Sequence, residues 1–180
     1  MKATGIVRRI DDLGRVVIPK EIRRTMRIRE GDPLEIYTSR DGEVIFKKYS
    51  LLGGMEDFAG QLCDTMSRST GSICAVTDRD TVIAVAGGGT RELMGKRITP
   101  ELEQIMEGRR IYQYTGEGQA LPVSDSSDKL LTHVAAPILA EGDLLGLVLF
   151  IGVEATPVTG DIEYKLAQTI AAFLGRHMET

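Results

Sequence analysis

The sequence contains only two cysteines and no long run of apolar residues. Cys63 and Cys74 are too few for a disulfide framework, and neither lies in a CxxC or Cys/His spacing typical of a zinc site. No apolar run reaches the roughly 18 residues that a membrane span needs, and MKATGIVRR lacks the apolar segment of a secretory signal. We therefore expect a cytoplasmic protein whose two thiols are buried.

The charges are divided unevenly along the chain. The formal net charge is −4, yet residues 1–49 carry 12 Lys/Arg and 8 Asp/Glu, whereas residues 50–180 carry 10 and 18. A basic segment is typical of contact with a polyanion, and the acidic remainder indicates a second module with a different role. We expect two domains, residues 1–52 and 53–180, with Ser50-Leu51-Leu52-Gly53-Gly54 as the linker.

The first fifty residues predict a β-β-α-β-β order. Two short strands, residues 5–10 and 15–18, flank a turn in which Gly14 is expected to take a positive φ, and Pro19 begins a helix of about two turns. The segment LEIYTSRDGEVIFKKY predicts a hairpin that turns at Asp41-Gly42. The apolar positions expected to form the core are Ile6, Val16, Val17, Ile18, Ile22, Leu34 and Ile36.

A domain this small buries little surface, so we expect it to gain stability from a second chain. Interleaving two chains into one barrel would share their apolar faces and cover the edges of the short strands. The N-terminal domain is therefore expected to be an obligate dimer.

The remaining residues predict an independent α/β domain. Apolar residues at helical spacing predict a first helix from Met55 to about Arg68, ended by Gly71, and a last helix from about Thr159 to Met178. The segments expected between them are strands SICAVTD and TVIAVAG, helical runs Thr90–Met94 and Thr99–Glu107, strand IYQYT, a 14-residue loop Gly116–Lys129, and strands LTHVAAPILA and LLGLVLFIGV. The apolar stripe expected on the last helix is Ile162, Leu166, Ile170, Phe173 and Leu174, with Ala167 and Ala171 beside it.

Residues 1–49 resemble the AbrB family of swapped-hairpin DNA-binding domains along their whole length. The resemblance rests on TGIVRRID, on LGRVVIPKEIRRTMRI and on the hairpin that follows, in the order and spacing of that family. The second half is similar to a GAF domain in its order of elements, and the pairing of the two resembles a family of bacterial sporulation regulators. These resemblances imply an α+β protein, in which an AbrB-like domain-swapped β-barrel precedes an α/β GAF-like domain.

The resemblance implies a regulator that binds double-stranded DNA at promoters and activates or represses sporulation genes. The arginines carried over from the family's DNA-binding face are Arg8, Arg9, Arg15, Arg23 and Arg24. We expect a homodimer through the N-terminal domain and a homotetramer through the C-terminal helices. The implied location is the nucleoid of the forespore, with no membrane partner and no cofactor.

Arginine suits this role because its permanent charge and planar donor fork can clamp a phosphate or pair with guanine O6 and N7. Arg23 and Arg24 are adjacent on a predicted helix and cannot share one face, so one is expected to reach the groove and the other a phosphate. If a dimer neutralises about eight phosphates, log K falls with log salt at a slope of about −7.

The second domain offers weaker signals. The GAF resemblance implies a small-molecule pocket between the sheet and its covering helices and loops, without naming the ligand. Gly87-Gly88-Gly89 before a helical run is either an anion cradle or a flexible turn, and we favour the turn. GTRELMGK departs from phosphate-loop spacing, which argues against a nucleotide hydrolase. Ordinary acidic turns are expected at Asp78, Asp80, Asp125 and Asp128, and no catalytic partner is evident for His133 or His177.

Two other functions are weighed against the regulator. GAF-like folds include the free methionine sulfoxide reductases, for which Cys63 and Cys74 would be the reactive thiols. Neither cysteine has a basic residue nearby in sequence to lower its thiol pKa, so we expect no enzyme. Some antitoxins share the swapped barrel but continue in an extended tail that wraps a toxin, whereas residues 53–180 predict a globular domain. We therefore favour the transcription regulator.

Overall fold

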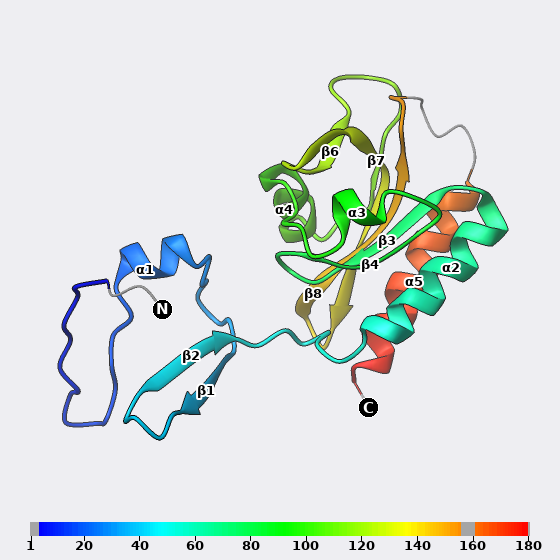
Figure 1. Ribbon diagram of the computed structural model, residues 1–180. Coiled ribbons are helices and arrows are strands. Elements are labelled where there is room, and N and C mark those ends of the chain that lie inside the picture. Colours follow the sequence, from blue (N-terminus) through cyan, green and yellow to red (C-terminus); the bar gives the residue numbers. More distant parts are fainter. Residues whose placement is uncertain (1–3, 156–160, 180) are drawn as a thin grey trace. The chain divides into compact units, whose positions relative to one another are not determined.

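The computed structural model describes residues 4–155 and 161–179 (Figure 1). The chain divides into two compact units, Met1–Tyr49 and Ser50–Thr180. Leu52, expected in the linker, is only 1% exposed and lies in the core of the second unit. Burial of its apolar side chain holds Leu52 in that core, so part of the predicted linker belongs to the second unit.

The N-terminal unit contains one short helix and one hairpin. Helix α1 (Lys20–Thr25) follows Pro19, and strands β1 (Leu34–Thr38) and β2 (Val44–Lys48) pair antiparallel with Ile36 opposite Phe46. The hairpin turns at Gly42, whose φ is 81°, and Gly14 has a φ of 76°. The predicted helix, the second hairpin and the positive φ of Gly14 are therefore confirmed.

The two strands predicted before α1 are wrong for the single chain. Residues 5–10 and 15–18 are assigned to no sheet, and Figure 1 draws them as two runs without arrows joined by a turn. One chain alone does not form the predicted core, because Ile6, Val16, Val17 and Ile36 are exposed and Ile18, Ile22 and Leu34 are only half-buried. Strands this short need a neighbour to supply hydrogen bonds and an apolar cover, and this single chain supplies neither.

The second unit is built on an antiparallel sheet in the order β4-β3-β8-β7-β5, with β6 also paired to β7. Its strands are β3 (Ile73–Thr77), β4 (Val82–Ala86), β5 (Tyr112–Gln113), β6 (Leu121–Ser124), β7 (Ser127–Ala140) and β8 (Asp143–Gly152). Its helices are α2 (Glu56–Thr70), α3 (Thr90–Leu93), α4 (Pro100–Glu107) and α5 (Ile162–His177). The predicted helices and the hairpin of β3 and β4 are confirmed, and residues 159–160 of the predicted last helix lie outside the described residues.

Helices cover both faces of this sheet. Figure 1 shows α2 and α5 side by side on one face and α3 and α4 on the other. Successive side chains of β8 alternate between the two cores, as expected for an extended strand. Val148 and Phe150 pack toward α2 and α5, whereas Leu147, Leu149 and Ile151 pack toward α3 and α4. Among the described helices, none is long and apolar enough to cross a membrane.

The predicted loop Gly116–Lys129 is wrong in part, because it contains β6 and the start of β7. Leu121 pairs with Thr132, and Val123 is fully buried in the core beside α4. Pro122 is compatible with this strand because an edge strand has backbone N–H groups that need no ladder partner. The residues of β6 therefore form a strand because β7 lies beside them, and their own sequence does not indicate this pairing.

The apolar stripe predicted for α5 is confirmed in part, because Leu174 is buried and Leu166 and Ile170 pack against the core while partly buried. The buried residues of this helix are Ala167, Ala171, Leu174 and Gly175. Ile162 and Phe173 are instead 66% and 47% exposed. A Cβ added to Gly175 would lie 2.0 Å from the carbonyl oxygen of Leu139, so the helix passes too close to β7 for large side chains.

Candidate nucleic-acid interface

The five arginines predicted to contact DNA lie in the N-terminal unit and are all exposed. Arg8 and Arg9 lie on the segment before the first turn, and Arg15 lies directly after that turn. Arg23 and Arg24 are consecutive residues in α1, which begins after Pro19. Since successive residues of a helix are about 100° apart, their guanidinium groups leave the helix in different directions. All five charges are therefore available to a ligand outside the chain.

The turn from Asp11 to Arg15 is held by the carboxylate of Asp11. Its Oδ1 accepts hydrogen bonds from the backbone N–H groups of Leu13 at 3.0 Å and Arg15 at 2.8 Å. Its Oδ2 accepts a hydrogen bond from Nε of Arg15 at 2.8 Å. The N–H of Gly14 donates to the carbonyl oxygen of Asp11 at 3.1 Å, and the N–H of Asp11 to that of Arg15 at 3.0 Å. This small network fixes the backbone that carries Arg15.

These contacts also stabilise the charged form of Asp11. The backbone hydrogen bond from Arg15, followed by that from the Arg15 side chain, lowers the pKa of the Asp11 carboxyl below its ordinary value. Asp11 was not among the predicted site residues. Its signal was present, because an aspartate that begins a turn commonly accepts hydrogen bonds from backbone groups two and more residues later.

A second set of contacts ties the end of α1 to β2. Nζ of Lys48 donates to the carbonyl oxygen of Arg27 at 2.9 Å and lies 3.7 Å from Oδ2 of Asp32. The same Oδ2 accepts the backbone N–H of Arg29 at 2.8 Å. Arg27 has a φ of 51°, a conformation uncommon outside glycine. These contacts fix the chain that leaves α1, and the sequence analysis missed them because Lys48 and Arg27 are 21 residues apart.

The three-glycine turn of the second unit is closely packed. Gly87, Gly88 and Gly89 have φ values of 87°, 139° and 69°. A Cβ on Gly87 would lie 2.3 Å from Oγ of Ser67, and one on Gly89 would lie 2.9 Å from a methyl group of Leu130. Both the backbone angles and the close packing therefore require glycine here. The helix that follows, α3, has only 4 residues.

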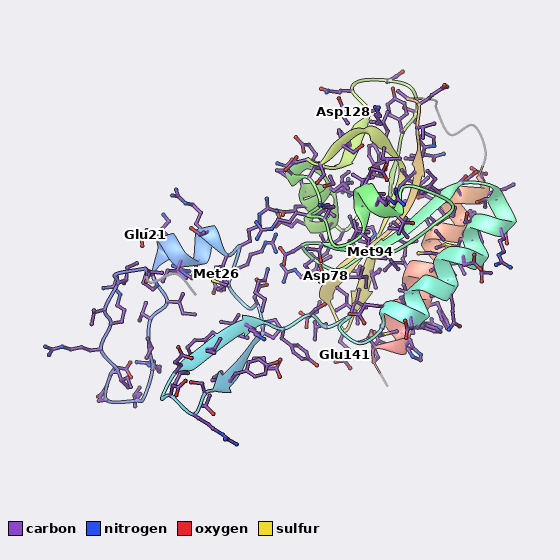
Figure 2. The ribbon with its side chains drawn as sticks, viewed as in Figure 1. Glu21, Met26, Asp78, Met94, Asp128 and Glu141 are labelled. Carbon is purple, nitrogen blue, oxygen red and sulfur yellow. The ribbon has the colours of Figure 1, made fainter. Side chains whose placement is uncertain are left out.

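Of the four aspartates expected in turns, Asp78 and Asp80 lie between β3 and β4 and Asp125 lies between β6 and β7, whereas Asp128 lies in β7. Oδ1 of Asp78 accepts the backbone N–H groups of Asp80 at 2.8 Å and Thr81 at 2.7 Å, which closes the turn between β3 and β4. Figure 2 shows Asp78 and Asp128 well apart. In residues 4–155 and 161–179, no three His, Cys, Asp or Glu side chains are grouped to hold a metal ion.

Both cysteines are buried free thiols. Cys63 lies in α2 and Cys74 in β3, and each is fully inaccessible. Burial raises the pKa of each thiol to about 12. The reactive species of a cysteine is the thiolate, so both groups are held in their unreactive form near neutral pH.

The two histidines make structural contacts. Nε2 of His133 lies 3.0 Å from the carbonyl oxygen of Glu154, which makes it the donor of that hydrogen bond. The ring of His177 stacks on Phe58 with centroids 5.2 Å apart, and Phe173 lies 6.1 Å from both rings. This aromatic cluster joins α2 to α5.

A hollow of about 390 Å³ lies between β7 and the C-terminal half of α5. Its floor is apolar, and Arg109, Gln168, Arg176 and Glu179 are among its lining residues. It lies on the face of the sheet that α5 covers.

Comparisons of the sequence with known proteins give matches to both units. Residues 54–179 match the family described as "Stage V sporulation protein T C-terminal, transcription factor". Residues 7–50 match the family described as "Antidote-toxin recognition MazE, bacterial antitoxin". The whole chain is 46% identical to stage V sporulation protein T of Bacillus subtilis over 179 residues, which covers 99% of each protein.

Solved structures resemble each unit separately. The N-terminal DNA recognition domain of the Bacillus subtilis transition-state regulator AbrB is 61% identical and covers 27% of this chain and 91% of its own, with a TM-score of 0.24. The GAF domain of a phosphoenolpyruvate-protein phosphotransferase from Coxiella burnetii is 13% identical, covers 69% of this chain and 82% of its own, and has a TM-score of 0.53. A free methionine-R-sulfoxide reductase from Thermoplasma acidophilum is 11% identical, covers 69% of this chain and 94% of its own, and has a TM-score of 0.52.

The two low-identity likenesses establish a GAF-like fold for the second unit and nothing more. The full-length identity and the match of residues 54–179 establish the family. The chain belongs to the family of stage V sporulation protein T, whose C-terminal domain is described as that of a transcription factor.

Proposed function

We propose that this protein is a transcription regulator of sporulation genes that binds double-stranded DNA through its N-terminal unit. The observation that carries the proposal is the 61% identity of this segment to a DNA recognition domain, together with full-length similarity to a sporulation regulator. The net charge of the two units supports the same division of roles, because the N-terminal unit is basic and the second is acidic. Bound near promoters, the protein activates or represses transcription by its position.

The DNA-binding face is formed by Arg8, Arg9, Arg15, Arg23 and Arg24. All five are exposed, so a phosphate or a base edge can approach each guanidinium without displacing other protein groups. Two chains bring ten such charges to one DNA site. If about eight phosphates are neutralised, log K falls with log salt at a slope of about −7.

The test is to measure DNA affinity for Arg8→Ala, Arg15→Ala and Arg23→Ala, with Arg110→Ala as the control. Arg110 is an exposed arginine of the second unit and is expected to have no effect. Loss of a base contact should weaken binding about tenfold, and loss of a phosphate contact should reduce the salt slope by about 1. The melting temperature should not fall, because these side chains are exposed. Unchanged affinity in all three variants would reject the proposed face.

We also propose that the N-terminal unit is a homodimer in which two chains interleave. One face of the β1–β2 hairpin carries Ile36, Val44 and Phe46, which are 61%, 61% and 38% exposed in the single chain. Val17, on the unpaired segment before α1, is 71% exposed. A second copy would cover these side chains and pair with the short unpaired segments.

The second unit is proposed to join two such dimers into a tetramer through α2 and α5. Ile162 and Phe173 of α5 are 66% and 47% exposed, and Phe173 belongs to the aromatic cluster with Phe58. Packing this face against its copy would remove these apolar side chains from water. Small-molecule regulation through the GAF-like domain stays a prediction, as does a location on the nucleoid of the forespore.

The two alternative functions have less support. A thiol enzyme needs an accessible thiolate, whereas Cys63 and Cys74 are buried with pKa values near 12. The antitoxin match is confined to residues 7–50, and the following 54–179 match a transcription factor family. We infer that the protein is not an enzyme.

A further inference from the structure

Asp11 is an acidic residue in the middle of the basic face. A carboxylate beside a DNA-binding arginine repels phosphate, so charge alone predicts that its removal tightens binding. The contacts of Asp11 predict the opposite. Both of its carboxylate oxygens hold Arg15, one through the backbone N–H at 2.8 Å and one through Nε at 2.8 Å.

This arrangement leaves the guanine-reading part of Arg15 free. The Nε atom is occupied by Asp11, and no hydrogen bond joins the two Nη atoms to any residue that the structure describes. The Arg15 side chain is 69% exposed. An arginine pairs with guanine O6 and N7 through its planar donor fork, and a partner on Nε restricts the rotation of that fork.

We propose that Asp11 is a positioning residue that holds the guanidinium of Arg15 ready to read a base, and so contributes sequence specificity to DNA binding. The inference rests on the proposed DNA-binding function. Pre-ordering one long side chain before binding avoids the entropy cost of ordering it in the complex. That gain applies where the base contact forms, and therefore raises specific binding more than non-specific binding.

Asp12 provides a matched control within the same turn. It is the next residue, is exposed, and carries the same charge. Its side chain makes no hydrogen bond or ion pair with any residue of the described chain. Removing Asp12 therefore removes a negative charge from the same place without releasing Arg15.

The experiment measures the affinity of the full-length protein for two duplexes. One is a 60-bp duplex that the wild-type protein selects from a random-sequence pool, and the other has the same bases in shuffled order. For Asp11→Ala, the ratio of specific to non-specific affinity should fall roughly 2- to 10-fold. For Asp12→Ala, both affinities should rise slightly and the ratio should stay the same.

Asp11→Asn separates positioning from folding of the turn. Its Oδ1 can still accept the two backbone N–H groups, whereas its amide NH₂ cannot accept the Nε–H of Arg15. This variant should keep the melting temperature of the wild type and lose specificity as Asp11→Ala does. In an Arg15→Ala background, Asp11→Asn should leave the ratio unchanged, because there is no guanidinium to position.

Two results would overturn the proposal: wild-type specificity in Asp11→Asn, or an equal loss of specificity with and without Arg15. The outcome for the proposed function is separate. If the wild-type protein selects no duplex from the pool, sequence-specific DNA binding itself is rejected, whatever the Asp11 variants do.

Discussion

Replacing Ile36 with alanine examines whether a second chain covers the N-terminal unit. Ile36 lies in the centre of β1, opposite Phe46 of β2, and is 61% exposed in the single chain. In a monomer, an exposed side chain contributes little to stability, so its truncation should be nearly neutral. In an interleaved dimer, the same side chain would be buried against the partner.

The expected magnitude follows from the exposed fraction. Burying a whole isoleucine side chain contributes roughly 1.5–3 kcal/mol, so covering the exposed 61% of Ile36 contributes about 1–2 kcal/mol per chain. Two copies contribute about 2–4 kcal/mol to each dimer. Loss of this burial should raise the dimer dissociation constant by a factor of roughly 30 to 1000.

Sedimentation equilibrium of the full-length protein measures this change directly. The control is Val153→Ala, since Val153 is 66% exposed but lies directly after β8 in the second unit. At the same protein concentration, the N-terminal unit should also melt at a lower temperature in Ile36→Ala than in the wild type, because fewer chains are paired. If Ile36→Ala and Val153→Ala have the same association and melting behaviour, no second chain covers this hairpin face.

Three further predictions concern the second unit. Phe173→Ser should weaken tetramer formation and leave dimers intact, because covering the 47% exposed ring contributes about 1 kcal/mol per chain; light scattering that finds unchanged tetramers would reject the α2–α5 interface. Cys63 and Cys74, with pKa values of about 12, should resist a thiol reagent at pH 8 until the protein is unfolded, and rapid labelling of the folded protein would contradict their burial. Both thiol pKa values in the folded protein are raised above the ordinary value of 9.0, so the thiols ionise more readily in the unfolded chain. The free energy of unfolding should therefore be unaffected below pH 9 and should fall as the pH rises toward 12, by up to about 1.4 kcal/mol per pH unit for each thiol. Comparing the unfolding of the wild type with that of the Cys63→Ala, Cys74→Ala double variant isolates this decrease.

Local signals predicted much of the secondary structure. Pro19 before α1 and Gly42 in the β1–β2 turn act through their own backbone angles, which depend little on distant residues. Helix α2 and its end at Gly71 were predicted for the same reason, and Gly71 has a φ of 77°. The five arginines were identified by their order in a family pattern, and the structure places all of them at the surface.

The errors occurred where a distant segment determines the outcome. Strand β6 was expected to be a loop because its pairing with β7, most of which was predicted as a strand, forms only when the sheet assembles. The core predicted for the N-terminal unit is exposed because the single chain does not cover it. The contacts of Asp11 are local but were not predicted, because the direction of Arg15 was attributed to the positive φ of Gly14 and not to the Asp11 carboxylate.

The sequence by itself determined the two-part division of charge, the local turns and helix ends, and the family to which the chain belongs, because each is carried by residue identity and short-range spacing. Only the tertiary structure decided that Ile162 and Phe173 of α5 stay exposed, and that the approach of Gly175 to the Leu139 carbonyl excludes large side chains there. It also decided that the carboxylate of Asp11 binds Nε of Arg15. Burial and hydrogen-bond geometry depend on which atoms are in contact in the folded protein, and residue identity alone does not specify those contacts.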